Sequence, residues 1–151
     1  MTTPEITACQ LLLGEKLGSI RSIHYLAELQ SAPPKSLGAL EIETKTGRFM
    51  HILPLAAGGC RIDSGPVPAP SGAARSSVRH WIDLTADVPY AFDDRPVVDR
   101  AEPLRRHGKT CGCSIEFSSG MRLIYEFRDG EPRLASVAKE TARSGEGTQS
   151  C

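Results

Sequence analysis

The chain has 151 residues, with 18 Lys and Arg against 18 Asp and Glu, and therefore a formal net charge of zero. Its length predicts a single domain that buries roughly two-thirds of its unfolded surface and needs no disulfide framework. The balanced charge argues against a nucleic-acid partner, and aromatic residues make up only 5% of the chain, too few for a base-stacking surface. The first residues lack the basic segment of a signal peptide, and no apolar run approaches the roughly 18 residues of a membrane helix. We therefore expect a soluble, cytoplasmic protein without membrane contact.

A short helix is predicted at the start of the chain. Thr3 is a suitable N-cap, a proline follows it at the first helical position, and Gly14 is placed to end the helix. Ile6, Cys9 and Leu13 recur at helical spacing. These three side chains are expected to form the apolar stripe that docks on the rest of the domain.

Most of the remaining chain is predicted to be β-structure. Residues 18–29 are rich in β-branched and aromatic side chains, which is typical of a strand. Residues 38–55 alternate apolar and charged positions on both sides of a Thr-Gly turn and indicate a hairpin. Residues 78–84 have the composition of a further strand, and residues 85–94 that of a turn or a helical turn.

Two hairpins resemble each other. The segments IETKTGRFMHI, from Ile42, and IEFSSGMRLIY, from Ile115, share an Ile-Glu pair, a turn glycine and an apolar return strand. We expect an α+β, mainly β domain over residues 1–137, with an antiparallel sheet or half-open barrel of about seven to nine strands. An internal duplication of residues 15–55 and 93–134 is one explanation of the similarity, and the general physics of strand pairs is the other.

Two segments are predicted to lack regular structure. Residues 64–77 are rich in Pro, Gly and Ser and have no apolar period, so they are expected to form a flexible loop or a contact surface. Residues 138–151 are small and polar and are expected to form a disordered tail.

The stretch HGKTCGCSIEFSSG suggests a metal or thiol site around His107, Cys111 and Cys113. These residue types suit zinc, but a second closely spaced cysteine pair is missing. Strand alternation places both cysteines on the face of Ile115 and Phe117, so we expect them to pack in the core. All five cysteines are expected to be free thiols, and no cofactor is predicted. A thiol- or metal-dependent enzyme with its site near these three residues stays open as an alternative.

No sequence motif names a reaction, and the features that remain favour binding to another protein. A small β-rich domain with a long loop and charged sheet faces suits a non-enzymatic binding role. In concrete form, the hypothesis is a bacterial immunity or antitoxin-like protein that inhibits a cognate toxin by binding it. A homo-oligomeric structural module, such as a homodimer paired through strand edges, is a further alternative. The predicted contact residues are Trp81, Arg79, His80, Pro66, Pro68, Glu41, Glu43 and Glu116.

Overall fold

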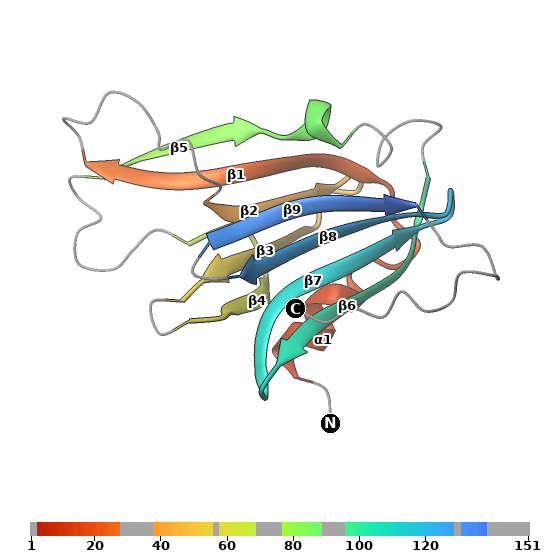
Figure 1. The fold of residues 1–151 in the computed structure, drawn as a ribbon. Coiled ribbons are helices and arrows are strands. Elements are labelled where there is room, and N and C mark those ends of the chain that lie inside the picture. The colour runs from red at the N-terminus through yellow and green to blue at the C-terminus, as the bar shows by residue number, and fades with distance from the viewer. Residues whose placement is uncertain are drawn as a thin grey trace.

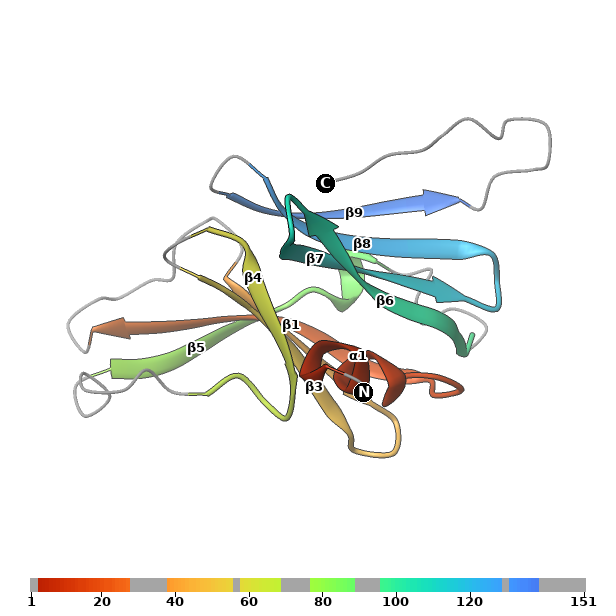
Figure 2. The same cartoon turned by 90° about the horizontal axis from the view of Figure 1, so that it is seen from below.

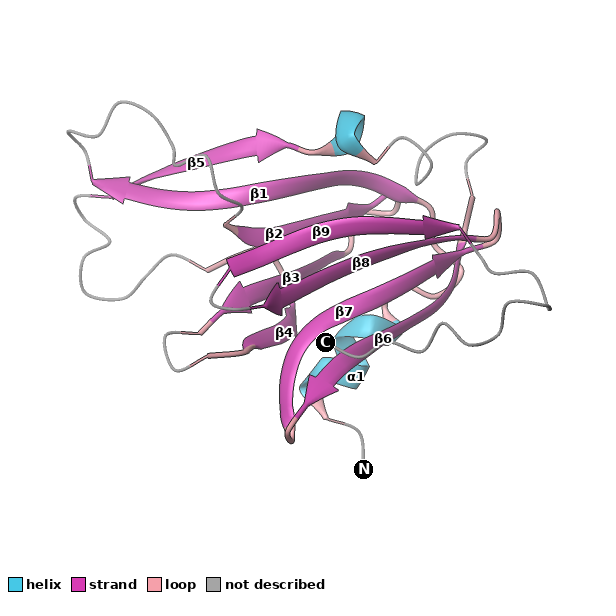
Figure 3. Cartoon of the chain, in the orientation of Figure 1, coloured by secondary structure: helices cyan, strands magenta, loops and turns pink. Residues whose placement is uncertain are grey.

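Strands dominate the structure, a computed structural model that describes residues 3–27, 38–55, 58–68, 77–88, 96–128 and 131–138 (Figure 3). They form two antiparallel sheets of five and four strands, accompanied by one short α-helix at the start of the chain. The predicted mainly β fold with a short N-terminal helix is therefore confirmed. The two sheets do not close into a barrel. Within the described ranges, no helix is long and apolar enough to cross a membrane.

The two sheets are built from two meanders (Figure 1). One sheet has the strand order β4-β3-β2-β1-β5, in which β5 adds to the free side of β1, and the other has the order β6-β7-β8-β9. All strand pairs in both sheets are antiparallel. The strand bounds are β1 (Leu17–Ala27), β2 (Ala39–Thr44), β3 (Phe49–Pro54), β4 (Cys60–Ser64), β5 (Ser77–Asp83), β6 (Val98–Arg106), β7 (Lys109–Phe117), β8 (Met121–Arg128) and β9 (Glu131–Ala138).

Helix α1 (Pro4–Gln10) lies between the two layers at one side of the molecule (Figure 2). It packs against β4 of one sheet and β6 of the other. The side chain of Thr3 accepts a hydrogen bond from the N–H of Ile6 at 3.2 Å, as expected for the predicted N-cap. The helix thus closes one side of the sandwich.

The buried side of the helical segment differs from the predicted stripe. Ala8, Cys9 and Leu12 are buried, whereas Leu13 is 45% exposed. The α-helix ends at Gln10, and the next turn is tighter, because the N–H of Leu12 bonds the carbonyl of Cys9, three residues back, at 3.1 Å. A turn of this kind stacks residues three apart, so Leu12 lies on the same buried side as Cys9 and the prediction for Leu13 is wrong.

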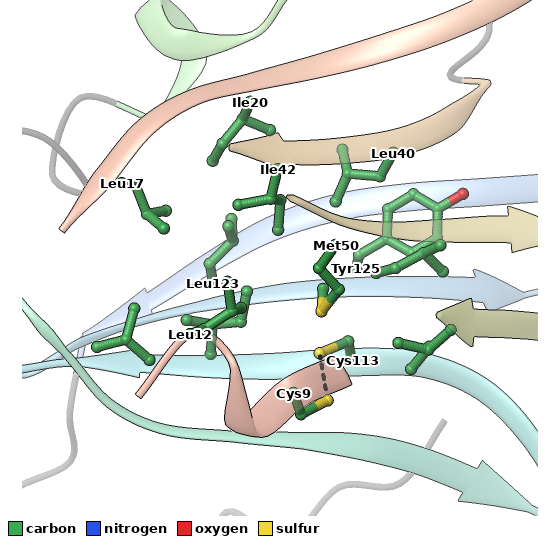
Figure 4. Packing of buried hydrophobic residues seen from close by; sticks show 14 of the residues in the cluster. Cys9, Leu12, Leu17, Ile20, Leu40, Ile42, Met50, Cys113, Leu123 and Tyr125 are labelled. Carbon is green, nitrogen blue, oxygen red and sulfur yellow. Dashed lines mark hydrogen bonds between the residues drawn. The ribbon is translucent and has the colours of Figure 1, made fainter. Parts of the chain in front are cut away.

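The inner faces of the two sheets share one hydrophobic core (Figure 4). Ile20 and Ile42 come from the five-stranded sheet, and Leu123 and Tyr125 come from the four-stranded sheet. Each of these side chains is at most 1% exposed, and burial of a side chain of this size contributes about 1.5–3 kcal/mol. The Tyr125 hydroxyl donates a hydrogen bond to the carbonyl of Gly38 at 3.2 Å and so joins the two sheets.

The sheets also meet at one corner. An isolated antiparallel bridge joins Lys16 to Val97. Beside it, the N–H of Gly14 donates to the carbonyl of Val98 at 2.8 Å, and the N–H of Val98 donates to the carbonyl of Glu15 at 2.9 Å. These bonds connect the start of β1 to the start of β6 through backbone alone.

The two similar hairpins have the same turn geometry. Gly47 has a φ of 90°, and its N–H bonds the carbonyl of Thr44 at 3.0 Å. At the matching offset, Gly120 has a φ of 94°, and its N–H bonds the carbonyl of Phe117 at 2.9 Å. The shared glycine therefore supplies a left-handed turn residue in both hairpins. A common origin of the two halves stays a hypothesis.

The predicted irregular segments are only partly described. Residues 65–68 follow β4 without regular structure, residues 69–76 lie outside the described residues, and residue 77 begins β5. Ala138 ends β9, and residues 139–151 of the predicted tail also lie outside the described residues.

Candidate functional site

A row of ionisable residues crosses the outer face of the five-stranded sheet. Cross-strand pairing places Arg21 opposite both Asp83 and Glu41, and places His51 opposite both Glu41 and Asp63. Neighbouring positions along the strands enter the core, so the row faces away from it. We name this set the charged row; across β5, β1, β2, β3 and β4 it consists of Asp83, Arg21, Glu41, His51 and Asp63.

Glu41, at the centre of the charged row, is buried. It is 1% exposed, and its Oε2 accepts a hydrogen bond from the backbone N–H of Val67 at 2.8 Å. Its Oε1 lies 3.9 Å from Nη1 of Arg21, whose side chain is 30% exposed. A buried carboxylate needs such donors and opposite charge nearby. Alternation along the strand assigns Glu41 to a charged sheet face, but the chain itself covers this carboxylate.

Residues 65–68 bury Glu41 by lying over the centre of the charged row. His51 is 6% exposed, and its Nδ1–H donates to the carbonyl of Gly65 at 2.9 Å. Val67 is buried in a small apolar cluster with Ile23 and Ala39 on the same outer face. The loop is thus held by two polar contacts to the row and by one apolar contact beside it. His51 has the structural, hydrogen-bonded role that its position within a strand suggests.

Arg21 connects the buried centre of the row to an exposed tryptophan. Its guanidinium lies 4.9 Å from the ring centroid of Trp81, which is 54% exposed. At the end of the row, hydrogen bonds from Thr85 lower the pKa of Asp83, and the charge of Arg21 adds a smaller effect in the same direction. One of these bonds comes from the Thr85 N–H at 2.9 Å. Cation–π contact and the ion pair with Glu41 together hold the arginine in place.

The structure gathers five of the predicted contact residues on or beside this face. Trp81 lies at its β5 side, and Pro66 and Pro68 are exposed on either side of the buried loop residue. Glu41 and Glu43 lie two residues apart on β2 and so share a face, although Glu43 is half-buried and Glu41 is fully buried. The exposed part of this group is therefore Trp81 with the two prolines.

The other three predicted contact residues are separate or undescribed. Glu116 lies in the other sheet, where its cross-strand partners are Arg100 and Arg122. Arg79 and His80 occupy β5 beside the tryptophan, but their side chains lie outside the described part of the structure. Glu116 is thus not part of a common site with the charged row.

The suspected metal or thiol site is divided between the surface and the core. His107 is exposed in the turn between β6 and β7, whereas Cys113 is 1% exposed within the hydrophobic core. Over the described ranges, no group of three or more His, Cys, Asp or Glu side chains could hold a metal ion. The residues predicted to meet around Cys111 therefore do not form such a group.

The cysteines are not all free. Cys9, Cys60 and Cys113 are buried free thiols, as expected, but Cys111 is disulfide-bonded, so the prediction is wrong at this position. In the pairing of β6 with β7, Leu104 lies opposite Gly112 and the next residue, Arg105, lies opposite Thr110. Cys111, between Thr110 and Gly112, is therefore the extra residue of a β-bulge. It is buried but does not belong to the core cluster that holds Cys113.

A pocket of about 250 Å³ lies between β9 and a single 3₁₀ turn, η2 (Thr85–Asp87). It has one ionisable side chain, that of Asp87, so it offers no acid–base pair. The residues that line it are Leu84, Asp87, Val88, Leu134, Ala135 and Ser136.

Comparison of the chain with family models, with curated proteins and with solved structures gave no match. The outer face of the five-stranded sheet is chemically mixed. It combines an exposed indole, a guanidinium fixed beside it, and carboxylates near both ends of the row. Glu41 and His51 both bond the backbone of the covering loop.

Proposed function

We propose that the chain is a non-enzymatic domain that binds another protein through the face around Trp81. The observation that carries this proposal is the Arg21–Trp81 pair, in which a guanidinium lies 4.9 Å from the centroid of a ring that is 54% exposed. Among the described residues, Trp81 is the most exposed large hydrophobic side chain. Tryptophan and arginine are enriched among the residues that dominate protein interfaces. An anchor that is already held in place also loses less conformational freedom on binding.

The surroundings of the pair suit a protein partner. Asp83 is the cross-strand neighbour of Arg21 and provides charge at the edge of the face, where charges favour specificity. Pro66 and Pro68 present a rigid, exposed backbone over the same sheet. Because the net charge is zero, long-range electrostatic steering contributes little to this binding.

In its concrete form, the proposal is a cytoplasmic bacterial immunity or antitoxin-like protein that inhibits a toxin by covering its active site. Two features support this form, the small size of the domain and the exposed face around Trp81. No sequence motif supports it. A gene for a toxin next to the gene for this chain would support it.

Affinity purification from the source cells tests the proposal. The wild-type chain should retain a stoichiometric partner, and Trp81→Ala should weaken its binding about 30-fold or more, as expected when an interface anchor is lost. Leu13→Ala is a matched control, since Leu13 is 45% exposed and belongs to the helical segment rather than to this face. Equal retention by Trp81→Ala and wild type would contradict the proposed face.

Two alternatives give different results in the same preparation. An enzyme near His107, Cys111 and Cys113 predicts a chain without a partner that shows thiol-dependent turnover or holds about one equivalent of metal. A homo-oligomeric module predicts a dimeric or larger mass for the pure chain. Either result would replace the binding proposal.

A further inference from the structure

Two buried thiols from distant parts of the chain touch each other. The sulfur of Cys9, in α1, lies 3.8 Å from the sulfur of Cys113, in β7, and 104 residues separate them in sequence (Figure 4). Both side chains are only 1% exposed, and both are free thiols. The contact joins the helix to the four-stranded sheet.

We propose that Cys9 and Cys113 form a reversible oxidation site, in which a low-molecular-weight disulfide of the glutathione class converts the thiol contact into a disulfide bond. The sulfurs are 3.8 Å apart and a disulfide requires about 2.05 Å, so they must approach by less than about 2 Å. Side-chain rotation and a small shift of a seven-residue helix can supply this movement.

An oxidant can reach the pair through local opening of α1. The helix is too short to be stable by itself, and its first turn is held through Glu5, which bonds Nη2 of Arg105 at 2.9 Å and the hydroxyl of Thr110. Such peripheral elements open more readily than the body of a domain. Opening of α1 would carry the Cys9 thiol away from β4 and β6 and would uncover the Cys113 thiol that touches it.

The two thiols differ from each other while α1 is closed. The hydrogen bond from Cys113 lowers the pKa of Cys9, whereas that same contact and burial raise the pKa of Cys113. When α1 opens, Cys9 is the thiol carried by the moving helix, and as a thiolate it attacks one sulfur of the small disulfide and expels one small thiolate. Cys113 then loses its proton and attacks the Cys9 sulfur, which expels the second small thiolate. Two cysteine thiols are oxidised, one small disulfide is reduced to two thiols, and the two cysteine protons end on those thiols.

The third core thiol is not expected to compete. Cys60 lies in β4, whereas the sulfur of Cys9 contacts that of Cys113 in β7, so the attack that closes the disulfide comes from Cys113. The Cys9–Cys113 bond would close a loop of about 100 residues, which strongly restricts the unfolded chain. The oxidised form is therefore expected to melt roughly 10 °C above the reduced form.

Thiol trapping and peptide mapping test the proposal on the wild-type chain. The protein is incubated with oxidised glutathione, free thiols are blocked with N-ethylmaleimide, and tryptic peptides are analysed without reduction. We expect residues 1–16 to be joined through Cys9 to Cys113 in residues 110–122, a peptide whose Cys111 carries its own disulfide, and the link to disappear with dithiothreitol. Cys111→Ser should keep the link, because it removes the other cysteine of the second peptide.

Melting temperatures provide the second readout. In a Cys111→Ser background, where the Cys111 disulfide cannot contribute, the chain should gain roughly 10 °C on oxidation, and adding Cys9→Ser or Cys113→Ser should abolish this gain. If both thiols of the oxidised wild-type sample carry N-ethylmaleimide, or if Cys9 is linked to any cysteine other than Cys113, the proposal is overturned. The mapping needs no core variant, so it decides the question even if a substitution prevents folding.

Discussion

The backbone N–H of Val67 donates a hydrogen bond to Oε2 of Glu41 at 2.8 Å and ties the covering loop to the centre of the charged row. The carboxylate is nearly inaccessible to water, with 1% exposure, and lies 3.9 Å from the guanidinium of Arg21. The same arginine lies against Trp81. The buried carboxylate of Glu41 thus holds the covering loop through Val67. It also holds Arg21, the residue on which Trp81 packs.

Glu41→Ala should lower the free energy of unfolding by roughly 2–4 kcal/mol, because it removes a buried acceptor and the partner of Arg21. Urea denaturation followed by circular dichroism measures this loss. Glu43→Ala is the matched control on the same strand and should change stability by less than about 0.5 kcal/mol. Equal effects of the two substitutions would show that the buried carboxylate does not hold the loop.

Gly112→Ala should be strongly destabilising for steric reasons. A Cβ at this position would lie 2.0 Å from the backbone oxygen of Tyr125 and 2.7 Å from the Cα of Glu126, so the β7–β8 pair would have to separate. We expect a loss of roughly 2–4 kcal/mol in urea denaturation. Gly47→Ala is the control; it introduces left-handed strain at a φ of 90° in open space and should cost about 1 kcal/mol. A smaller loss for Gly112→Ala than for the control would refute the close approach.

Local patterns were sufficient to predict the elements with strong signals. Thr3 and the proline after it mark the start of α1, and alternation around Gly47 marks the β2–β3 hairpin. Strand β4 (Cys60–Ser64) was missed, although Cys60 and Ile62 alternate with charged residues, which is a usable signal. Strand β9 (Glu131–Ala138) has a proline and small residues and gives little signal of its own; it forms along the edge of β8.

The candidate site could be predicted only in part, because it depends on contacts between distant residues. Trp81 and the prolines are contact residues by prediction from the sequence, and they stay so, whereas the charged row exists only after five strands pair in register. Glu41 looks like a surface residue in sequence, since alternation does not show that a later loop covers it. Likewise, alternation through Cys111 and Cys113 failed at the bulge, where one extra residue interrupts the period of two.

His107→Asn should stabilise the chain. His107 and Gly108 form the two-residue turn between β6 and β7, with φ values of 51° and 76°. Two left-handed residues in a hairpin turn favour Asn-Gly, and histidine is less suited to the first position. We expect a gain of roughly 0.5–1 kcal/mol, visible as a rise in melting temperature of about 1–4 °C. His107→Val is the opposing control, since a β-branched side chain resists this conformation, and it should lower the melting temperature. A loss on His107→Asn would indicate that the histidine has a role beyond the turn.

Stability should fall at alkaline pH, in part because of Cys60. Burial raises its pKa from 9.0 to about 12, so the folded state keeps the proton that the unfolded state loses. The stabilising contribution is therefore fully present below about pH 9 and is lost as the pH rises from about 9 to about 12. Cys60→Ala removes this titration while keeping a small apolar side chain. Between about pH 8 and about pH 10, the stability advantage of wild type over Cys60→Ala should shrink by about 1.4 kcal/mol in urea denaturation. A constant difference across this range would mean that the buried thiol does not titrate as its surroundings predict.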